Sequence, residues 1–339
     1  MTGLDVVAVL SALILSTGLL VAVVTAVWWF DRYDREPLHL VAGVFLWGAL
    51  VAPVLSVAVS SFLAAALHVT PAVTLGWLGP VVEEVMKAAG LGLVVLLSRE
   101  FDNPTDGLVY GTAVGLGFGA TENVIYAAAG LGAVGVAETA SLVLVRTAMC
   151  AGIHALSSAA LGGCLGFATL SGSRRRRVGW AAGGLAAAVA LHATWNLTVL
   201  GAAAAAGPRV PELWLAALPV LYALYLGILA LFLRSEQRIL RELLSEEVAL
   251  EMVPAWVSEV IPSYRRRIRS DWWPSRRERT VLARLLTRLA FRKYAVRRLG
   301  RPESDLAGLE VVRLRQRIRA MLATSDECQS SVEGEAASS

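Results

Sequence analysis

The sequence is poor in charged residues and in cysteine. Charged residues make up 17% of the 339 residues, whereas a soluble domain has about 25%. This low share of charge excludes an ordinary soluble globular domain for most of the chain. The cysteines are Cys150, Cys164 and Cys328, and no pair of them has the spacing of a metal site or indicates a disulfide framework.

Lysine is nearly absent, because Lys87 and Lys293 are the only two lysines and all other cationic side chains are arginines. Together with the abundant alanine and glycine, this preference indicates a GC-rich bacterial genome and therefore a bacterial cell membrane. The net charge of +4 comes from residues 234–339. Such a basic tail suits anionic lipids. No nucleic-acid fingerprint accompanies it, so we expect no nucleic-acid partner.

Long apolar runs predict an all-α polytopic membrane protein. About seven transmembrane helices are expected at 4–30, 39–66, 73–97, 107–130, 142–171, 178–203 and 212–233. The first run lacks a positive n-region and is too long for a signal peptide, so we interpret it as a span. The predicted domains are a membrane domain at 1–234, a basic helical cytoplasmic tail at 235–323 and a disordered C-terminus at 324–339.

Arginine occurs in alternate loops, at 31–37, 99–106 and 172–177. The positive-inside rule places these loops and the tail in the cytoplasm and the N-terminus outside. The sequence therefore predicts a multi-pass protein of the cell membrane with a cytoplasmic C-terminal tail.

The predicted span at 107–130 has a glycine at every fourth position from Gly107 to Gly119. This small-xxx-small pattern allows a neighbouring helix to approach closely. Residues 115–120 also match a dinucleotide fingerprint by letter, but no strand precedes them and they lie inside a span, so we reject that interpretation.

Glu83, Glu84 and Lys87 lie within the predicted span at 73–97. Charged groups near the middle of a bilayer are costly, so the default interpretation is a functional site. The structural alternative is a buried ion pair between Glu83 and Lys87, which have the favoured i,i+4 order.

Further polar residues lie at a similar depth in other predicted spans. They are Glu122, Asn123, His154, His192 and Asn196, with Arg146 near an outer end. At about 1.5 Å per residue, four helices place Glu83, Glu122, His154 and His192 roughly 21–25 Å above the cytoplasmic edge. This common level predicts one shared site in the outer half of the bilayer.

Carboxylates and imidazoles in a low-dielectric cavity suit the activation of water. His192 and Asn196 share a helix face and can donate to a developing oxyanion. The sequence has neither a Ser-His-Asp arrangement nor the HExxH spacing of zincins. Hydrolysis by activated water, without a covalent intermediate, is the chemistry that this set favours, and a peptide bond within the membrane is its natural target.

These residues resemble the PrsW family of intramembrane proteases and, more distantly, the CAAX-prenyl endopeptidases. The similar motifs are EExxK from Glu83 to Lys87, FxxxE from Phe118 to Glu122, the single His154, and HxxxN from His192 to Asn196. The resemblance covers roughly residues 20–200 of this sequence.

The resemblance implies a glutamate-dependent, metal-independent endopeptidase in the plasma membrane. Glu83 would be the general base, Glu122 would hold the water, His192 and Asn196 would stabilise the oxyanion, and His154 would orient groups or shuttle protons. The wider superfamily usually has a histidine where this sequence has Glu122, which leaves the roles of Glu83 and Glu122 open. The implied substrates are membrane-anchored regulators, such as single-span anti-sigma factors.

Two other functions use the same residues. Glu83, Glu122, His154 and His192 would also suit a zinc-dependent membrane protease, since carboxylates and imidazoles ligate zinc. Alternatively, they would form an ion or proton relay in a membrane protein that is not an enzyme. A transporter usually has internal repeats, and the sequence has no second EExxK or FxxxE segment.

Overall fold

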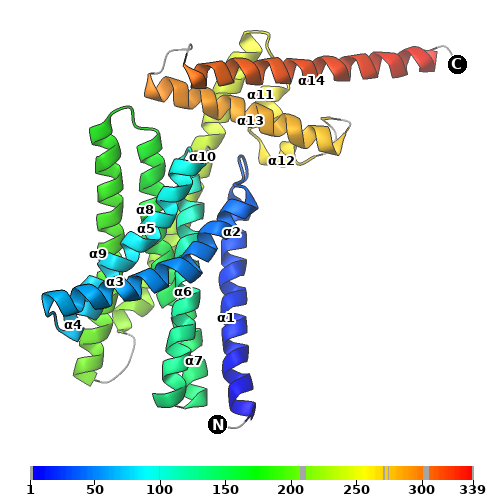
Figure 1. Ribbon diagram of the computed structural model, residues 1–339. Helices are drawn as coiled ribbons and strands as arrows, with labels where there is room; N and C mark the ends of the chain where they lie inside the picture. Colours follow the sequence, from blue (N-terminus) through cyan, green and yellow to red (C-terminus); the bar gives the residue numbers. More distant parts are fainter. Residues whose placement is uncertain are drawn as a thin grey trace. The chain divides into compact units, whose positions relative to one another are not determined.

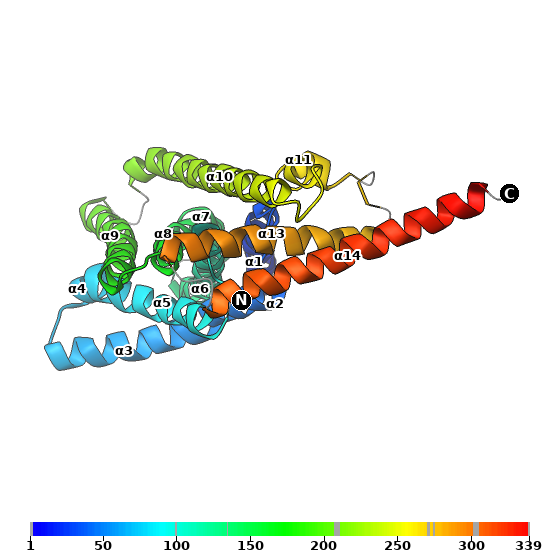
Figure 2. The same cartoon turned by 90° about the horizontal axis from the view of Figure 1, so that it is seen from above.

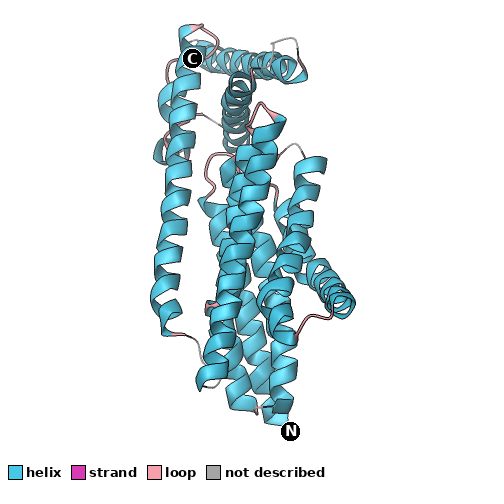
Figure 3. Cartoon of the chain, turned by 90° about the vertical axis from the view of Figure 1, so that its left-hand side faces the viewer, coloured by secondary structure: helices cyan, strands magenta, loops and turns pink. Residues whose placement is uncertain are grey.

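The computed structural model describes residues 3–98, 100–133, 135–206, 211–269, 272–273, 275–300 and 305–337. In this part of the chain every regular element is a helix (Figure 3). The chain divides into two compact units. Unit 1 comprises Met1–Asp31 and Arg35–Ala230, and unit 2 comprises Arg32–Asp34 and Leu231–Ser339. Three residues of the first expected cytoplasmic loop thus belong to the C-terminal unit.

Unit 1 is built from apolar helices that run from the N-terminus to the first part of α10 (Figure 1). They are α1 (Gly3–Phe30), α2 (Leu38–Leu46), α3 (Ala52–Leu67), α4 (Pro71–Val73), α5 (Gly79–Leu97), α6 (Pro104–Ala133), α7 (Val136–Ala148), α8 (Cys150–Thr169), α9 (Arg174–Ala206) and α10 (Glu212–Ala249). Two π-helical segments, η1 (Trp47–Val51) and η2 (Thr74–Leu78), interrupt this series. Such segments often occur at functional sites.

Five helical stretches are long and apolar enough to cross a membrane. They are Val6–Phe30, Leu38–Leu67, Val136–Thr169, Arg174–Ala205 and Glu212–Ala249. The predicted spans at 73–97 and 107–130 are also helical, in α5 and α6, but charges in α5 and glycines in α6 make them less apolar. The all-α polytopic fold is therefore confirmed, while the number of seven crossings stays a prediction.

Helices α6 and α8 pack along each other in close contact. A Cβ atom added at Gly107, Gly111 or Gly115 would overlap main-chain atoms of α8, among them the carbonyl of His154. Glycine at these positions lets the two backbones approach directly, as the small-xxx-small pattern predicts. This contact fixes the height of α6 relative to α8, and both helices carry site residues.

Unit 2 contains α11 (Val257–Val260), α12 (Tyr264–Arg267), α13 (Arg276–Leu299) and α14 (Leu306–Ala337), together with the end of α10. The neighbours α13 and α14 run side by side over part of their length (Figure 2). The Ser275 hydroxyl accepts from the Glu278 N–H at the start of α13. Gly300, with φ 61°, ends the same helix in the left-handed conformation that glycine adopts readily.

The core of unit 2 is apolar and includes the loop residue Tyr33. Leu240, Leu282 and Leu286 are fully buried in it. The Tyr33 hydroxyl donates to the carbonyl of Pro262 over 2.9 Å. Burial raises the pKa of the Tyr33 phenol, so it remains a donor at neutral pH. The C-terminal unit therefore has its own core, into which the first loop inserts one aromatic side chain.

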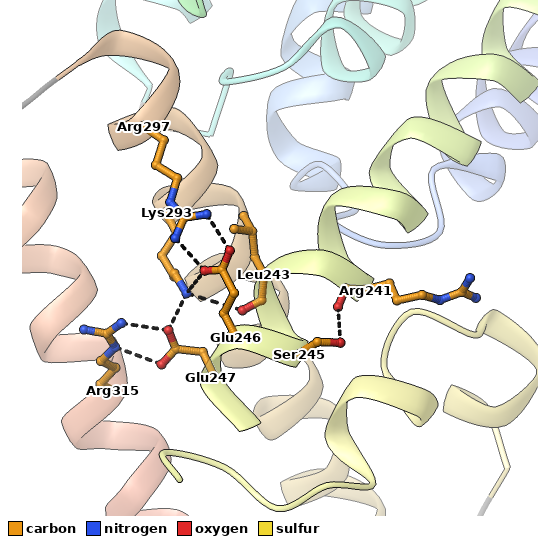
Figure 4. A network of polar contacts seen from close by, with 8 residues as sticks. All are labelled: Arg241, Leu243, Ser245, Glu246, Glu247, Lys293, Arg297 and Arg315. Atoms are coloured by element: carbon orange, nitrogen blue, oxygen red, sulfur yellow. Dashed lines mark hydrogen bonds and ion pairs between the residues drawn. The ribbon is translucent and has the colours of Figure 1, made fainter. Parts of the chain in front are cut away.

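A network of charged side chains joins three helices of unit 2 (Figure 4). Lys293 on α13 contacts Glu247 of α10 over 2.5 Å and the Leu243 carbonyl over 3.3 Å. Arg315 on α14 contacts the same Glu247 over 2.7 Å. Glu247 is fully buried, and both of its oxygens are engaged. The expected disorder at 324–339 stays a prediction: α14 extends to Ala337, and Ser338 and Ser339 lie outside the described residues.

Candidate functional site

Helix α5 places two buried charges inside unit 1. Glu84 and Lys87 are each 0% exposed, and Lys87 Nζ lies 2.8 Å from Glu84 Oε1. The alternative interpretation, a Glu83–Lys87 ion pair, is therefore wrong, because Lys87 pairs with the residue three positions before it. Residues at i and i+3 also share a helix face. This face points toward His154, which holds the ammonium from the other side.

His154 of α8 contacts a donor with one ring nitrogen and an acceptor with the other. Its Nδ1 lies 2.9 Å from Lys87 Nζ, and its Nε2 lies 2.7 Å from Glu122 Oε2. An ammonium group can only donate, so Nδ1 accepts and the ring proton resides on Nε2. The two contacts thus favour one neutral tautomer of His154, which donates to Glu122.

His192 of α9 faces both glutamates of α5. Its Nδ1 lies 2.9 Å from Glu84 Oε1, and its Nε2 lies 3.7 Å from Glu83 Oε2. Because Glu84 is ion-paired to Lys87, it acts as an acceptor, and His192 Nδ1 donates to it. The Nε2 lone pair then faces Glu83. A separation beyond 3.5 Å between two polar atoms suits a bridging water.

Glu122 of α6 forms an ion pair with Arg146 of α7. Arg146 Nη2 lies 2.7 Å from Glu122 Oε2, and the guanidinium carbon lies 3.5 Å from the centroid of the Tyr126 ring. Polar contacts between side chains therefore connect five helices, α5 to α9. The connected residues, in order, are Arg146, Glu122, His154, Lys87, Glu84, His192 and Glu83.

Glu83 differs from Glu84 and Glu122, the other two carboxylates of this cluster, in the partner that it contacts. Glu84 contacts Lys87 and Glu122 contacts Arg146, whereas Glu83 contacts His192 at 3.7 Å. Its buried Oε2 has no hydrogen-bond partner among the residues that the structure describes. Lone pairs on such an oxygen can accept from a water molecule. Glu83 and His192 Nε2 therefore each present a lone pair that can accept a hydrogen bond.

Phe118 forms an aromatic wall beside the buried lysine. Lys87 Nζ lies 4.1 Å from the centroid of its ring, and the ring lies 5.0 Å from the His154 ring, centroid to centroid. The negative face of an aromatic ring attracts an ammonium group, more strongly where water is excluded. The aromatic residue of FxxxE thus helps to hold Lys87 between Glu84 and His154.

A cavity of about 110 Å³ adjoins three of the connected residues, Glu122, Arg146 and His154. Its lining residues come from η2 and from α6 to α9, and they are Leu75, Glu122, Tyr126, Arg146, Cys150, His154, Trp195, Asn196, Val199 and Leu200. Asn196 Nδ2 donates to the Leu75 carbonyl over 2.9 Å. Asn196 therefore links α9 to the π-helical segment before α5, and its second amide hydrogen remains available for a ligand.

Asn123 is the one predicted residue that the structure places away from this cluster. Its Nδ2 donates to Ser16 Oγ over 3.1 Å and to Thr147 Oγ1 over 3.0 Å. These contacts connect α6 to α1 and α7, so its position indicates packing. Sequence reasoning missed Tyr126, which lies four residues after Glu122 and thus on the same helix face. This i,i+4 spacing from Glu122 could have identified Tyr126 as a residue of the site.

The fold and the buried polar cluster together define an all-α, multi-pass membrane protein with an interior site. Residues 36–231 match the family described as "PrsW family intramembrane metalloprotease". This match covers more than half of the chain, which therefore belongs to the PrsW family.

Two relatives named "Protease PrsW" are similar to the chain. The protein of Geobacillus kaustophilus (strain HTA426) is 33% identical over 151 residues, which are 44% of this chain and 64% of that protein. The protein of Bacillus subtilis (strain 168) is 30% identical over 176 residues, which are 49% of this chain and 72% of that protein. The chain thus spans slightly less than two thirds of the first relative. No solved structure matches it.

The family description implies a metal ion, for which carboxylates and imidazoles are suitable ligands. Glu83, His154 and His192 each have a ligand atom within 4.8 Å of the others. His192 suits a metal, since its Nδ1 bonds a carboxylate and its Nε2 lone pair is directed away from it. His154 does not, because both of its ring nitrogens are engaged. A metal on Nε2 would displace Glu122 and put the ring proton on Nδ1, against the Lys87 ammonium, and a metal on Nδ1 would displace that ammonium. The set does not fit a three-ligand zinc site.

Proposed function

We propose that the protein is an intramembrane endopeptidase that hydrolyses peptide bonds with water activated by Glu83. The observation that carries this proposal is that Glu83, unlike Glu84 and Glu122, contacts no lysine or arginine among the described residues. A carboxylate paired with a cation is a weaker base, because the cation stabilises its charged form. This difference favours Glu83 over Glu122 as the general base.

In the proposed reaction, a water lies beside Glu83 Oε2 and His192 Nε2, which are 3.7 Å apart, and donates one hydrogen bond to each. Glu83 takes a proton from the water as it attacks the carbonyl carbon. Glu84 orients His192 through Nδ1, and His154 links Glu122 to Lys87. The free amide hydrogen of Asn196 contributes to binding the substrate carbonyl. General base catalysis of this kind contributes about 10²–10⁴-fold to the rate.

The proposed substrates are single-span membrane proteins, including regulators such as anti-sigma factors. The cluster lies within helices of a membrane protein, where a peptide bond in another transmembrane segment can reach it. Arginine in alternate loops supports an N-terminus outside and a cytoplasmic tail in the cell membrane. The basic C-terminal unit would then face anionic lipids on the inner leaflet.

The Glu83→Gln variant tests the proposal. Gln keeps the volume of the side chain but cannot accept the water proton, so we expect at least a 10²-fold loss of cleavage. Proteomics of shed ectodomains would compare cells that carry the wild-type protein with cells that carry the variant. Glu138→Gln, on an exposed carboxylate of α7, is the matched control. Equal shedding in both strains, with both proteins folded, would remove Glu83 as the base.

The second candidate is a zinc protease, to which the family description and the proximity of Glu83, His154 and His192 point, but His154 would have to give up a contact with Glu122 or Lys87 to bind the metal. Metal analysis of the purified protein separates the candidates. A glutamate-dependent enzyme should hold no stoichiometric zinc and keep its activity after chelation. Stoichiometric zinc whose removal ends cleavage, and whose return restores it, would establish the metalloprotease.

A further inference from the structure

Arg146 is a buried cation in the wall of the site cavity. The residue is 9% exposed and lines the cavity together with Glu122, His154 and Asn196. It lies on α7, eight residues before His154, and Cys150 lies between them; all three side chains face the cavity. A desolvated guanidinium requires partners for its donors, because an unmade hydrogen bond is costly in the interior.

The known contacts of Arg146 do not use all of its donors. Nη2 contacts Glu122, and the Tyr126 ring covers one face of the guanidinium. The buried Nε has no hydrogen-bond partner in the described part of the chain. A guanidinium has five N–H donors in a rigid fork that matches a carboxylate or a carbonyl oxygen. Arg146 therefore retains donors for a ligand that enters the cavity.

Most other donors near the cavity are already engaged, and the second amide hydrogen of Asn196 is the exception. Lys87 donates to Glu84 and His154, His154 donates to Glu122, and His192 donates to Glu84. Asn196 uses one amide hydrogen on the Leu75 carbonyl. Among the described residues that line the cavity, Arg146 is the only lysine or arginine. Charge that develops on a substrate oxygen in this cavity would therefore be stabilised most strongly by Arg146.

We propose that Arg146 is a catalytic residue that binds the carbonyl oxygen of the scissile peptide bond. This inference rests on the proposed peptidase function. The water oxygen bonds to the carbonyl carbon, its proton passes to Glu83, and the C=O π-electron pair moves onto the oxygen held by Arg146. The tetrahedral intermediate then re-forms C=O and releases the amine, which takes the proton from Glu83. The products are a carboxylic acid and a free amine; the acid passes its proton to the amine, which becomes an ammonium group, and the guanidinium binds the resulting carboxylate.

Binding of the product distinguishes this role from a structural one. The probes are two peptides with the sequence on the N-terminal side of the cleaved bond of a substrate, one ending in a carboxylate and one in an amide. The carboxylate peptide should inhibit the wild-type enzyme at least about 10-fold more strongly, as expected for a charge-assisted contact. In Arg146→Met the two peptides should inhibit equally. A residue that only supports the fold would not discriminate between them.

Kinetics of the same variant give a second measurement. Removal of one oxyanion donor typically lowers kcat about 10²–10³-fold, and KM should change much less. Arg146→Lys keeps a positive charge beside Glu122 and serves as the variant that folds if Arg146→Met does not. It should regain part of the discrimination. Equal inhibition of the wild type by both peptides would overturn the inference, as would discrimination that survives in Arg146→Met.

The failure of this inference is distinguishable from the failure of the proposed function. If Glu83→Gln cleaves normally, the peptidase mechanism is wrong. If Glu83→Gln is inactive but the wild type does not prefer the carboxylate peptide, the mechanism stands and only the role of Arg146 is wrong.

Discussion

Both lysines of the chain are buried among carboxylates. Lys87 contacts Glu84, and Lys293 contacts Glu246 and Glu247. An ammonium group is compact, and its three hydrogens can point in different directions, whereas a guanidinium is planar and larger. The chain uses arginine at its other cationic positions. Lysine therefore stands where a small cation must fit between several acceptors.

Replacement of Lys87 by Met should destabilise the protein by about 3–5 kcal/mol, because Glu84 would stay buried without its cation. Cleavage should also be lost, since His154 would lose the donor that fixes its tautomer. Thermal unfolding in detergent measures the first effect and substrate processing the second. Lys87→Arg should not restore activity, because its planar fork would meet the Phe118 ring.

The double variant Glu84→Gln/Lys87→Met is the control for the Lys87 prediction. It removes both charges, so it should be more stable than Lys87→Met alone. If Lys87→Met unfolds at the wild-type temperature, the buried pair is not important for stability.

At the scale of the helices, the glycine face of α6 determines whether the site can form. Glu122 on α6 must lie 2.7 Å from His154 on α8. Gly115 lies against the carbonyl of His154 itself, so any larger residue there separates the two helices where the contact is made. The geometry of the polar cluster therefore depends on the close packing of α6 against α8.

Gly115→Ala should destabilise the protein by about 1–3 kcal/mol through overpacking and should reduce cleavage. The matched control is Gly92→Ala on α5, where an added Cβ meets nothing within 4 Å. That change should be neutral or stabilise by up to about 1 kcal/mol, because alanine loses less backbone freedom in a helix. Melting temperatures and cleavage rates check both. Equal behaviour of the two variants would contradict the interpretation of the interface.

At the scale of the whole molecule, two cores fold from one chain. The core of unit 1 is made of helices that carry the site, and the core of unit 2 surrounds Leu240, Leu244 and Leu286. Arg32–Asp34 also belong to unit 2, where Arg267 Nη2 donates to the Tyr33 carbonyl over 3.1 Å. The C-terminal unit is thus a folded domain rather than a polar extension.

Lys293→Met should loosen unit 2 while leaving unit 1 unchanged. Glu247 would retain Arg315 but lose its buried partner on α13, at a cost of about 3–5 kcal/mol. Amide hydrogen exchange should therefore accelerate in α13 and α14 but not in α6 and α8. Arg297→Met is the control: this side chain is 54% exposed, and its ion pair with Glu246 should contribute only about 0–1 kcal/mol. If amide hydrogen exchange accelerated as much in α6 as in α13, the interpretation that the two cores are independent would be wrong.

Residue order alone was enough to predict the helical membrane fold, the candidate residues and the motifs that resemble the PrsW family. Apolar run length, charge in the middle of a span and glycine at every fourth position are local properties, so they can be read from residue order. Asn123 shows the limit of such patterns, because it adjoins Glu122 in sequence yet bonds to Ser16 and Thr147.

The pairing of the charged side chains, which leaves Glu83 without a lysine or arginine partner among the described residues, could be seen only in the folded protein. Glu83 and Glu84 are adjacent and identical in type, and helical spacing favoured Glu83 as the partner of Lys87. Lys87 instead pairs with Glu84, since Glu84 and His154 enclose its ammonium together. Ion pairing in the interior depends on distances of a few ångströms between helices far apart in sequence. Those distances depend on how the helix backbones pack, and the packing cannot be read from the order of residues.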